Sequence, residues 1–263
     1  MTTPKRYELE DAQWDRIKGY FPPYRTGRPS SLDNRTALNA LLWLMRSGAP
    51  WRDLPERYGS WKTVYSRFRA SVSSGLFEQV FLELIDDPDM ENLSLDSTIV
   101  RAHQKATGGK KNAECMVENQ AIGLSRGGRT TKIHALVDGL GNPLGFRLTG
   151  GQVHDSQVAS ELLEGFDISQ SNIIADKAYG TAKLRQYIED KAGVYTIPPK
   201  ENTKDKWTCD YHVYCERHLI ENFFNQLKNF QLKNFRRIAT RYDKLAHVYL
   251  ATVYIASICI LLK

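Results

Sequence analysis

Residues 93–103, LSLDSTIVRAH, decide the fold class of this chain. Leu93, Leu95 and Ile99 alternate with polar positions, which is the period of a strand with one buried face. Before this stretch the apolar residues follow a helical period, and after it strands and helices take turns along the chain. The sequence therefore predicts a helical region followed by an α/β domain. The boundary is expected near residues 86–92, DDPDMEN, where acids and a proline interrupt the helical pattern.

Residues 89–263 are expected to form the α/β domain. The pattern predicts strands and helices in the order three strands, helix, strand, helix, strand, helix. The strands are expected over 93–103, 131–138, 142–150, 172–176 and 194–197, and the helices over 155–163, 181–191 and from about Tyr214. This order is typical of a mixed sheet with helices on its faces. Residues 104–130, rich in Gly, Lys and Arg, are expected to form a loop between the first two strands.

Residues 1–88 are expected to form a helical region with a core of its own. One helix is predicted from an Asp33 N-cap to Ser47-Gly48, a short one over 51–59, and a basic one from Ser60. Helix, turn, short helix, turn and basic helix is the outline of a helix-turn-helix DNA reader, although many helical bundles share it. The basic side chains that would meet DNA are Lys62, Arg67 and Arg69.

Composition excludes several broad classes. With 41% hydrophobic and 25% charged residues, the 263-residue chain fits neither wholesale disorder nor a protein with many membrane spans. Residues 245–262 are the one candidate span, but His247, Thr252 and Ser257 favour a helix buried in a domain core. The first residues contain no apolar secretory segment, and four scattered cysteines favour a reducing cytosol. We therefore expect a cytoplasmic protein without a membrane partner.

The charge balance favours a polyanionic partner. Lys and Arg number 36 against 30 Asp and Glu, which gives a formal net charge of +6. Beyond Glu221 the only acid is Asp243, against the basic residues Lys228, Lys233, Arg236, Arg237, Arg241, Lys244 and Lys263. A surface that faces phosphates and a solvated helix face explain this excess equally well.

Three carboxylates stand out from their surroundings. Asp96 lies within strand 93–103, Asp176 ends strand 172–176, and Glu221 lies among apolar residues of the last long helix. Acids at the ends of buried strands are costly unless they are paired or bind a metal, and Mg²⁺ prefers oxygen ligands. Plain structural roles stay open: Asp96 could cap a turn, Asp176 could cap the next helix, and Glu221 could face solvent.

Residues 214–228, YCERHLIENFFNQLK, contain a more specific pattern. Tyr214, Arg217, Glu221 and Lys228 are separated by two, three and six residues. This spacing resembles the Y-(2)-R-(3)-E-(6)-K signature of DDE-type insertion-sequence transposases. Further stretches resemble the insertion-sequence-five family of bacterial mobile elements, so the similarity covers nearly the whole chain. They are GAPWRDLPERYGSWKTVYSRF, LSLDSTIVRAH, QAIGLSRGGRTTKIHALVD, ADKAYG and RRIATRYDK.

The resemblance implies a fold, a reaction and a set of site residues. It implies an RNase H-like catalytic domain in which Asp96, Asp176 and Glu221 are catalytic and bind two Mg²⁺ ions per site, for which Mn²⁺ can substitute. Such an enzyme cuts the ends of its element and joins the 3′-hydroxyls to target DNA. Two metals would activate the nucleophile and stabilise the departing oxygen. By the same matching, Arg217 and Lys228 would contact phosphates and Tyr214 would stack on a displaced base.

The resemblance also implies partners. The N-terminal helices would recognise the terminal inverted repeats, and a homo-oligomer would hold the double-stranded ends and the target, associated with the bacterial nucleoid. Two alternatives stay open: a decayed, non-catalytic copy that binds DNA and acts as a repressor, and a related metal-dependent nuclease that cuts without joining.

The sequence departs from the family pattern at three places. Ala178 stands where a glycine is usual, Cys215 stands where a basic residue is common, and QLKNF occurs twice in tandem, at 226–230 and 231–235. Five extra helical residues rotate everything that follows by about 140° net, which would re-aim the apolar stripe. We therefore expect that deletion of one copy raises stability or activity. Equal melting temperature and equal cleavage in the deletion variant would contradict this.

Two sets of residues could be mistaken for sites. Cys209, His212, Cys215 and His218 recur every three residues, but on one helix this step spreads the side chains too widely to bind zinc. His103, His134 and His154 are expected near strand ends. His103 and His154 could line the active site and help to position the scissile phosphate, or they could be surface residues or hydrogen-bonded neighbours of the site residues.

Overall fold

The computed structural model describes residues 7–22, 32–107, 120–228 and 235–263. The chain divides into two compact units. The helical unit comprises Met1–Ile85 and Leu227–Lys263, and the α/β unit comprises Asp86–Gln226. The change from helices to strands falls where the sequence places it. The last 37 residues, however, group with the N-terminal helices instead of with the sheet.

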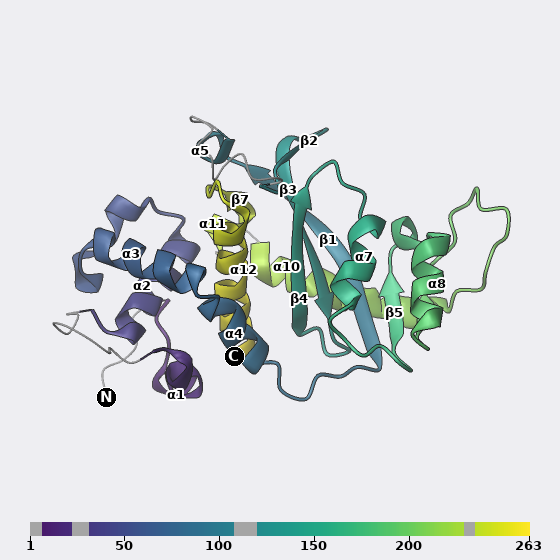
Figure 1. The fold of residues 1–263 in the computed structure, drawn as a ribbon, viewed down its shortest axis with the longest axis horizontal. Coiled ribbons are helices and arrows are strands. Elements are labelled where there is room, and N and C mark those ends of the chain that lie inside the picture. The colour runs from purple at the N-terminus through teal and green to yellow at the C-terminus, as the bar shows by residue number, and fades with distance from the viewer. Residues whose placement is uncertain (1–6, 23–31, 108–119, 229–234) are drawn as a thin grey trace. The chain divides into compact units, whose positions relative to one another are not determined.

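A mixed sheet forms the centre of the α/β unit (Figure 1). Its strands are β1 (Asn92–Ala102), β2 (Gly123–Ser125), β3 (Gly128–Val137), β4 (Pro143–Gly150), β5 (Asn172–Ala175) and β6 (Val194–Thr196). The strand order is β2-β3-β1-β5-β6, and β4 pairs with β3. Strands β1, β3 and β4 are antiparallel, whereas β5 and β6 run parallel to β1. Three antiparallel strands extended by two parallel ones give the RNase H-like topology that the sequence analysis expects.

Helices cover both faces of this sheet. Leu162 of α7 (Ser156–Leu163) lies against Gly145 of β4. The next strand residue, Phe146, stacks on Phe223 of α10 (His218–Lys228) with ring centroids 5.8 Å apart. Because consecutive strand residues point to opposite faces, α7 and α10 lie on opposite sides of the sheet. The α/β unit also contains α8 (Ala182–Asp190), the one-turn helices α5 (Gln104–Thr107) and α9 (Tyr211–Tyr214), and 3-10 turns at Lys177–Tyr179 and Cys215–Arg217.

The predicted elements of the α/β unit are confirmed with two differences. The expected helix from about Tyr214 begins at Tyr211 and passes through the 3-10 turn Cys215–Arg217 before α10 starts. The expected loop 104–130 contains α5 and the short strand β2. Residues 108–119 of that loop, with Cys115, lie outside the described residues.

The helical unit is built from short helices around one long C-terminal helix. They are α1 (Asp11–Ile17), α2 (Asn34–Ser47), α3 (Trp61–Ser73), α4 (Leu76–Glu83), α11 (Arg236–Ala239) and α12 (Ala246–Leu261), with 3-10 turns at Lys18–Tyr20, Trp51–Asp53 and Glu56–Tyr58 and the short β7 (Thr240–Arg241). Between α2 and α3 the chain therefore makes two 3-10 turns and not the expected short α-helix.

The caps of α2 follow the sequence prediction. Asp33 Oδ1 accepts the backbone N–H of Thr36 at 2.8 Å, and Gly48 ends the helix with φ 73°, a left-handed conformation that suits glycine. The expected inner face of α3, Val64 and Phe68, is buried. Ser60 precedes α3 as expected, but its side chain makes no capping hydrogen bond.

Helix α12 is a core helix of the helical unit, as the polar residues in its sequence indicate. Tyr249, Val253 and Ile255 are fully buried. The Tyr254 hydroxyl donates to Glu78 Oε1 of α4 at 2.8 Å, so the C-terminal helix is tied to the N-terminal ones. Among the residues that the structure describes, no helix combines the length and apolarity that crossing a membrane requires.

Part of the basic excess near the C-terminus is buried, which neither sequence interpretation anticipated. Arg241 has no exposed surface and donates to the carbonyls of Asp243 and Lys244, both at 2.9 Å. Arg237 is 6% exposed and lies 3.8 Å from the Asp243 carboxylate. These two arginines stabilise the turn before α12 and face neither phosphate nor solvent.

The tandem QLKNF repeat lies mostly outside the described residues. The structure describes α10 to Lys228 and the chain again from Phe235. The expected change in the direction of the apolar stripe therefore stays a prediction.

Candidate active site

The β-sheet places the first two acids on adjacent strands. In the parallel pair of β1 and β5, Leu95 lies opposite Ala175; Asp96 is the next residue of β1, and Asp176 directly follows the end of β5. Neighbouring strands are about 4.8 Å apart, so the two carboxylates start from adjacent backbone positions. Asp96 within β1 and Asp176 directly after β5 are thus acids of adjacent strands, and their role as metal ligands stays a prediction.

Arg217 links Asp96 to the third acid. Its Nη1 donates to Asp96 Oδ2 at 2.7 Å, and its Nη2 pairs with Glu221 Oε1, one helical turn further along the chain. The side chains of Asp96 and Arg217 are 19% and 23% exposed, whereas Glu221 is 50% exposed. One guanidinium therefore holds two of the three predicted catalytic carboxylates at the surface of the sheet.

The charge state of Asp96 reflects this crowded site. Burial raises the pKa of the Asp96 carboxyl to about 6, and the charges of Asp176 and Asp155 add to the rise. The Ser97 backbone N–H, which donates to Asp96 Oδ1 at 2.7 Å, and the Arg217 cation act in the opposite direction. The pKa of Arg217 is raised, because the attraction of Asp96 and Glu221 outweighs its burial.

Two further residues of the spacing pattern lie on the same chain segment. The Arg217 guanidinium lies 6.0 Å from the ring centroid of Tyr214, and burial raises the pKa of the Tyr214 hydroxyl. Lys228 ends α10, where burial lowers the pKa of its ammonium group. Tyr214 is therefore close to the acids, and Lys228 is half-buried.

The donor set suits a hard divalent cation, although the described geometry is that of an ion-pair cluster. Carboxylate oxygens are the ligands that Mg²⁺ prefers, and a cation, the Arg217 guanidinium, already lies between Asp96 and Glu221. Within the described ranges no three His, Cys, Asp or Glu side chains stand close enough to hold a metal. That holds for the acids in their present positions and for the repeated Cys and His residues of 209–218.

A polar network lies on the other side of β1, and its role at the site is not predicted from the sequence. Ser97, next to Asp96, donates from its hydroxyl to Asp155 Oδ1 at 2.9 Å. Lys132 Nζ donates to the same oxygen at 2.8 Å and to the carbonyl of Val153 at 2.8 Å. Asp155 stands at the N-cap position of α7, but its side chain makes no capping bond and serves this network instead. Lys132, a charged residue in the largely apolar strand 131–138, is the sequence signal that points to this polar network.

Two buried aromatic residues complete the surroundings of Ser97. His134 lies inside β3 and not near a strand end as expected, and its Nε2 lies 2.8 Å from Thr149 Oγ1. Burial lowers the pKa of His134 to about 4, so the ring is neutral near pH 7. Tyr179 is 1% exposed, and burial beside Asp155 and Asp96 raises the pKa of its hydroxyl.

The other two histidines differ from His134 in their exposure. His154 is exposed, and its Nδ1 lies 3.2 Å from Ser156 Oγ. His103 directly follows β1, and its Nδ1 accepts the backbone N–H of Lys105 at 3.2 Å. Neither contact places these two rings among the acids, and whether they line the site stays an open prediction.

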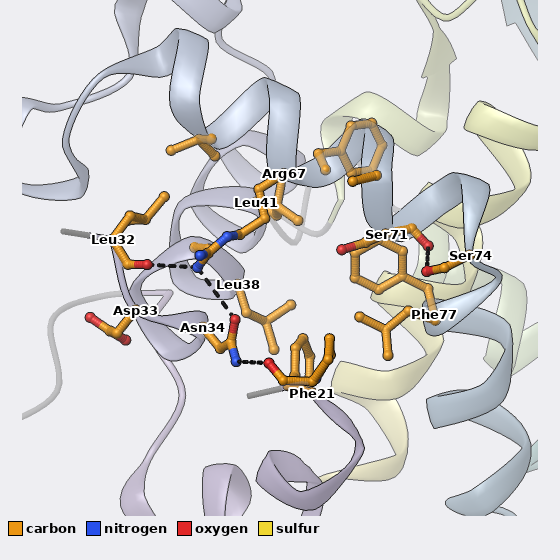
Figure 2. A pocket seen from close by; sticks show the side chains of 16 residues that line it. Phe21, Leu32, Asp33, Asn34, Leu38, Leu41, Arg67, Ser71, Ser74 and Phe77 are labelled. Carbon is orange, nitrogen blue, oxygen red and sulfur yellow. Dashed lines mark hydrogen bonds between the residues drawn. The ribbon is translucent and has the colours of Figure 1, made fainter. Parts of the chain in front are cut away.

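The predicted DNA-reading side chains of α3 differ in their surroundings. Arg67 donates to the carbonyl of Leu32 at 2.7 Å and to Asn34 Oδ1 at 3.3 Å, beside a cavity of about 580 Å³ in the helical unit (Figure 2). Arg67 thus ties α3 to the start of α2. Lys62 is exposed and Arg69 is half-buried, and seven residues apart they share one helix face.

Clustered carboxylates such as Asp96, which lies within β1, and Asp176, which follows β5, suit metal-assisted enzymes that act on phosphodiesters. Comparison of the sequence with protein-family models agrees with this class. The model described as "Transposase DDE domain" matches residues 87–260, and the model described as "Putative transposase of IS4/5 family" matches residues 9–81. The chain belongs to the DDE transposase family.

Two curated relatives match about half of this chain and most of their own length. "Uncharacterized protein y4sN" of Sinorhizobium fredii is 41% identical over 120 residues, which are 45% of this chain and 96% of that protein. "Putative transposase for insertion sequence element IS6501" of Brucella ovis is 40% identical over 119 residues, which are 44% of this chain and 85% of that protein.

Solved transposases resemble the fold distantly. The piggyBac transposase in its synaptic complex with hairpin DNA gives a TM-score of 0.41 at 11% identity. That match covers 75% of this chain and 50% of piggyBac, so the chain spans half the length of that relative. The Mos1 transposase paired-end complex gives a TM-score of 0.27 at 12% identity, over 85% of this chain and 87% of Mos1. The family assignment rests on the sequence matches.

Proposed function

We propose that this DDE transposase binds the terminal inverted repeats of its insertion sequence, cleaves the DNA ends and joins the 3′-hydroxyls to target DNA. The observation that supports this most is the arrangement of the acids. Asp96 and Asp176 follow paired positions of adjacent strands, and Glu221 is held to Asp96 by one guanidinium. Crowded carboxylates on one side of a sheet suit charge-based catalysis of phosphoryl transfer, which needs positioning more than a covalent nucleophile.

Each residue of the site then has a defined task. DDE transposases generally use divalent metals, and Asp96, Asp176 and Glu221 would hold two Mg²⁺ ions, or Mn²⁺ in their place. The bound metals supply nucleophile activation and charge neutralisation. Arg217 and Lys228 bind phosphates near the cut, and Tyr214 presents its ring to a displaced base. Lys62 and Arg69 on α3 contact the inverted repeat, and Arg67 holds α3 in place for that contact.

The partners follow from the same proposal. The enzyme acts on double-stranded DNA of the bacterial nucleoid, at the element ends and at a target site. A homo-oligomer brings the two ends together, since both must be joined to one target.

The test is cleavage of end-labelled DNA that carries the sequences flanking the gene. The full-length protein is incubated with this DNA in Mg²⁺ or in EDTA, beside the isosteric variants Asp176→Asn and Asp96→Asn. We expect metal-dependent nicks at the element boundary and joined products with target DNA. The variants are expected to lose at least about 1,000-fold in rate while still binding DNA.

Each other outcome selects a different function. Nicks without joined products indicate the metal-dependent nuclease. Bound but uncut DNA indicates a decayed copy that acts as a repressor. Normal cutting by Asp96→Asn would contradict the assignment of the acids.

A further inference from the structure

Arg217 contacts two acids of the site, and this position indicates a role beyond the phosphate contact that the proposed function gives it. Its two terminal nitrogens are engaged by different carboxylates: Nη1 by Asp96 at 2.7 Å, and Nη2 by Glu221. These are two of the three groups that the proposed function assigns to metal binding. The positive charge of Arg217 therefore lies between two carboxylates that the proposed function assigns to divalent cations.

We propose that Arg217 is a built-in counter-cation: it holds Asp96 and Glu221 together before metal binding and releases them to the divalent cations. The released guanidinium is then available to a DNA phosphate. This inference rests on the proposed function, because it takes the acids as metal ligands. It adds that metal and arginine compete for the same oxygens.

The site needs such a cation when no metal is bound. Asp96, Asp176 and Glu221 are like charges, and Asp96 is largely buried, so repulsion and lost hydration both disfavour the ionised cluster. The planar guanidinium of arginine presents two donors at a fixed spacing, which lets one side chain serve two carboxylates. A lysine at this position would supply the charge without that fork.

The same contacts occupy oxygens that a metal would use. Asp96 Oδ1 accepts the Ser97 N–H at 2.7 Å, and Asp96 Oδ2 and Glu221 Oε1 accept from Arg217. This fits the finding that the described residues contain no preformed group of three metal ligands. Release of Arg217 would free Asp96 Oδ2 and Glu221 Oε1 for a metal.

The position of Arg217 permits its release. Arg217 ends the 3-10 turn Cys215–Arg217, before the regular helix α10 begins, and its side chain is 23% exposed. Glu221 is half exposed, so the outer ion pair opens to solvent with little loss of packing. A DNA phosphate gives the guanidinium a new bidentate partner, so DNA and metal are expected to strengthen each other's binding.

To test this competition, Mn²⁺ is titrated into the full-length protein without DNA, and the binding is measured by calorimetry. We expect Arg217→Gln to bind Mn²⁺ about tenfold more tightly than the wild type, because the competing cation is gone. Arg217→Lys keeps the charge but not the fork, and its affinity is expected to lie between the two. The matched control is Arg147→Gln, which removes an exposed arginine that donates to the Phe146 carbonyl and should leave Mn²⁺ affinity unchanged.

Thermal melting supplies a second readout that is independent of DNA cleavage. Without metal, Arg217→Gln is expected to melt below the wild type, because Asp96 and Glu221 lose their counter-charge. Added Mn²⁺ should raise its melting temperature more than that of the wild type. If Arg217→Gln is too unstable to titrate, Arg217→Lys carries the test alone with the same sign.

The inference and the proposed function fail in different ways. Mn²⁺ affinity in Arg217→Gln and Arg217→Lys equal to or weaker than in the wild type overturns the inference, even where the wild type cuts DNA. Mn²⁺ binding that does not change in Asp96→Asn shows that the acids are not the ligands, which overturns the proposed function as well.

Discussion

At the scale of single residues, Asp96 lies next to a polar network that begins at Ser97. Asp96 and Ser97 are consecutive on β1, so their side chains point to opposite faces of the sheet. Asp96 meets Arg217 on one face, whereas Ser97 donates to Asp155 on the other. The Ser97 backbone N–H also donates to Asp96 Oδ1. Asp155 therefore contacts the strand that carries Asp96 through the neighbouring Ser97.

Asp155→Asn tests this network. The change leaves the Lys132 ammonium, which is 12% exposed, without its counter-charge. We expect the free energy of unfolding to fall by about 2–4 kcal/mol, measured by urea denaturation. Ser97→Ala, which removes one hydrogen bond to the same carboxylate, should cost only about 1 kcal/mol. Equal stability of Asp155→Asn and the wild type would show that the network does not support the sheet.

His134 predicts a pH dependence of stability. Its pKa in the folded protein is about 4, below the usual value of 6.5, because the ring is buried; Lys132 and Asp155 are the charged groups that face it. Between these pH values the unfolded chain binds a proton that the folded protein does not. The free energy of unfolding therefore falls as the pH is lowered from 6.5 to 4, by up to about 3 kcal/mol.

Urea unfolding at several pH values measures this effect. His134→Gln removes the titrating ring, so its stability should change less over this pH range than that of the wild type. The exposed His154 provides the matched control, and His154→Gln should keep the wild-type slope. An unchanged slope in His134→Gln would assign the acid sensitivity to other groups.

At the scale of elements, the helix caps differ in what they contribute. Asp33 accepts both the backbone N–H and the hydroxyl of Thr36, at 2.8 and 2.6 Å, whereas Ser60 makes no capping bond to α3. Asp33→Ala is expected to lower the free energy of unfolding by about 1 kcal/mol, and Ser60→Ala by far less. Chemical denaturation of the two variants measures the difference, and equal losses would contradict it.

Elements with a clear period or a clear boundary residue could be predicted from the sequence. Strand 93–103 shows its alternation, and Asp33 and Gly48 mark both ends of α2. Other features depend on distant parts of the chain and leave no local pattern. By its local sequence Asp155 matches a helix cap. Only the folded sheet shows that Ser97 and Lys132 donate hydrogen bonds to its carboxylate.

Like the helices and strands, the candidate site could be predicted from the sequence only in part. Asp96 and Asp176 could be placed on adjacent strands because both follow apolar strand residues, whereas their common level, with Leu95 opposite Ala175, is visible only in the folded sheet. The spacing of Arg217 and Glu221 indicated a shared role, but their direct contact with each other and with Asp96 depends on how α10 packs on the sheet. Side-chain pairing of that kind has no periodic signal in a sequence.

At the scale of the whole molecule, the helical unit is discontinuous in sequence. Residues 227–263 pack with residues 1–85, and α12 supplies fully buried side chains such as Tyr249 and Val253 to their core. The boundary seen in the sequence, near residue 88, marks where strands begin, but it does not mark where the helical unit ends.

A pair of fragments tests this division. Residues 1–85 alone lack the apolar surface of α12, so we expect no cooperative unfolding and weak near-ultraviolet circular dichroism. The same residues joined to 227–263 by a flexible linker are expected to unfold cooperatively in urea. Cooperative unfolding of 1–85 alone would show that α12 is dispensable.

The ladder between β1 and β5 fixes the separation of Asp96 and Asp176, whatever length of chain lies elsewhere. Residues 198–210 form a loop without helix or strand. The Trp207 indole donates to the Ile197 carbonyl at 2.7 Å, and this hydrogen bond holds the two ends of the loop together. A foreign domain inserted between Lys200 and Lys206 would therefore leave Asp96 and Asp176 where they are. A chain lengthened at that point would keep the spacing of Asp96 and Asp176, because the added residues belong to neither strand of the ladder.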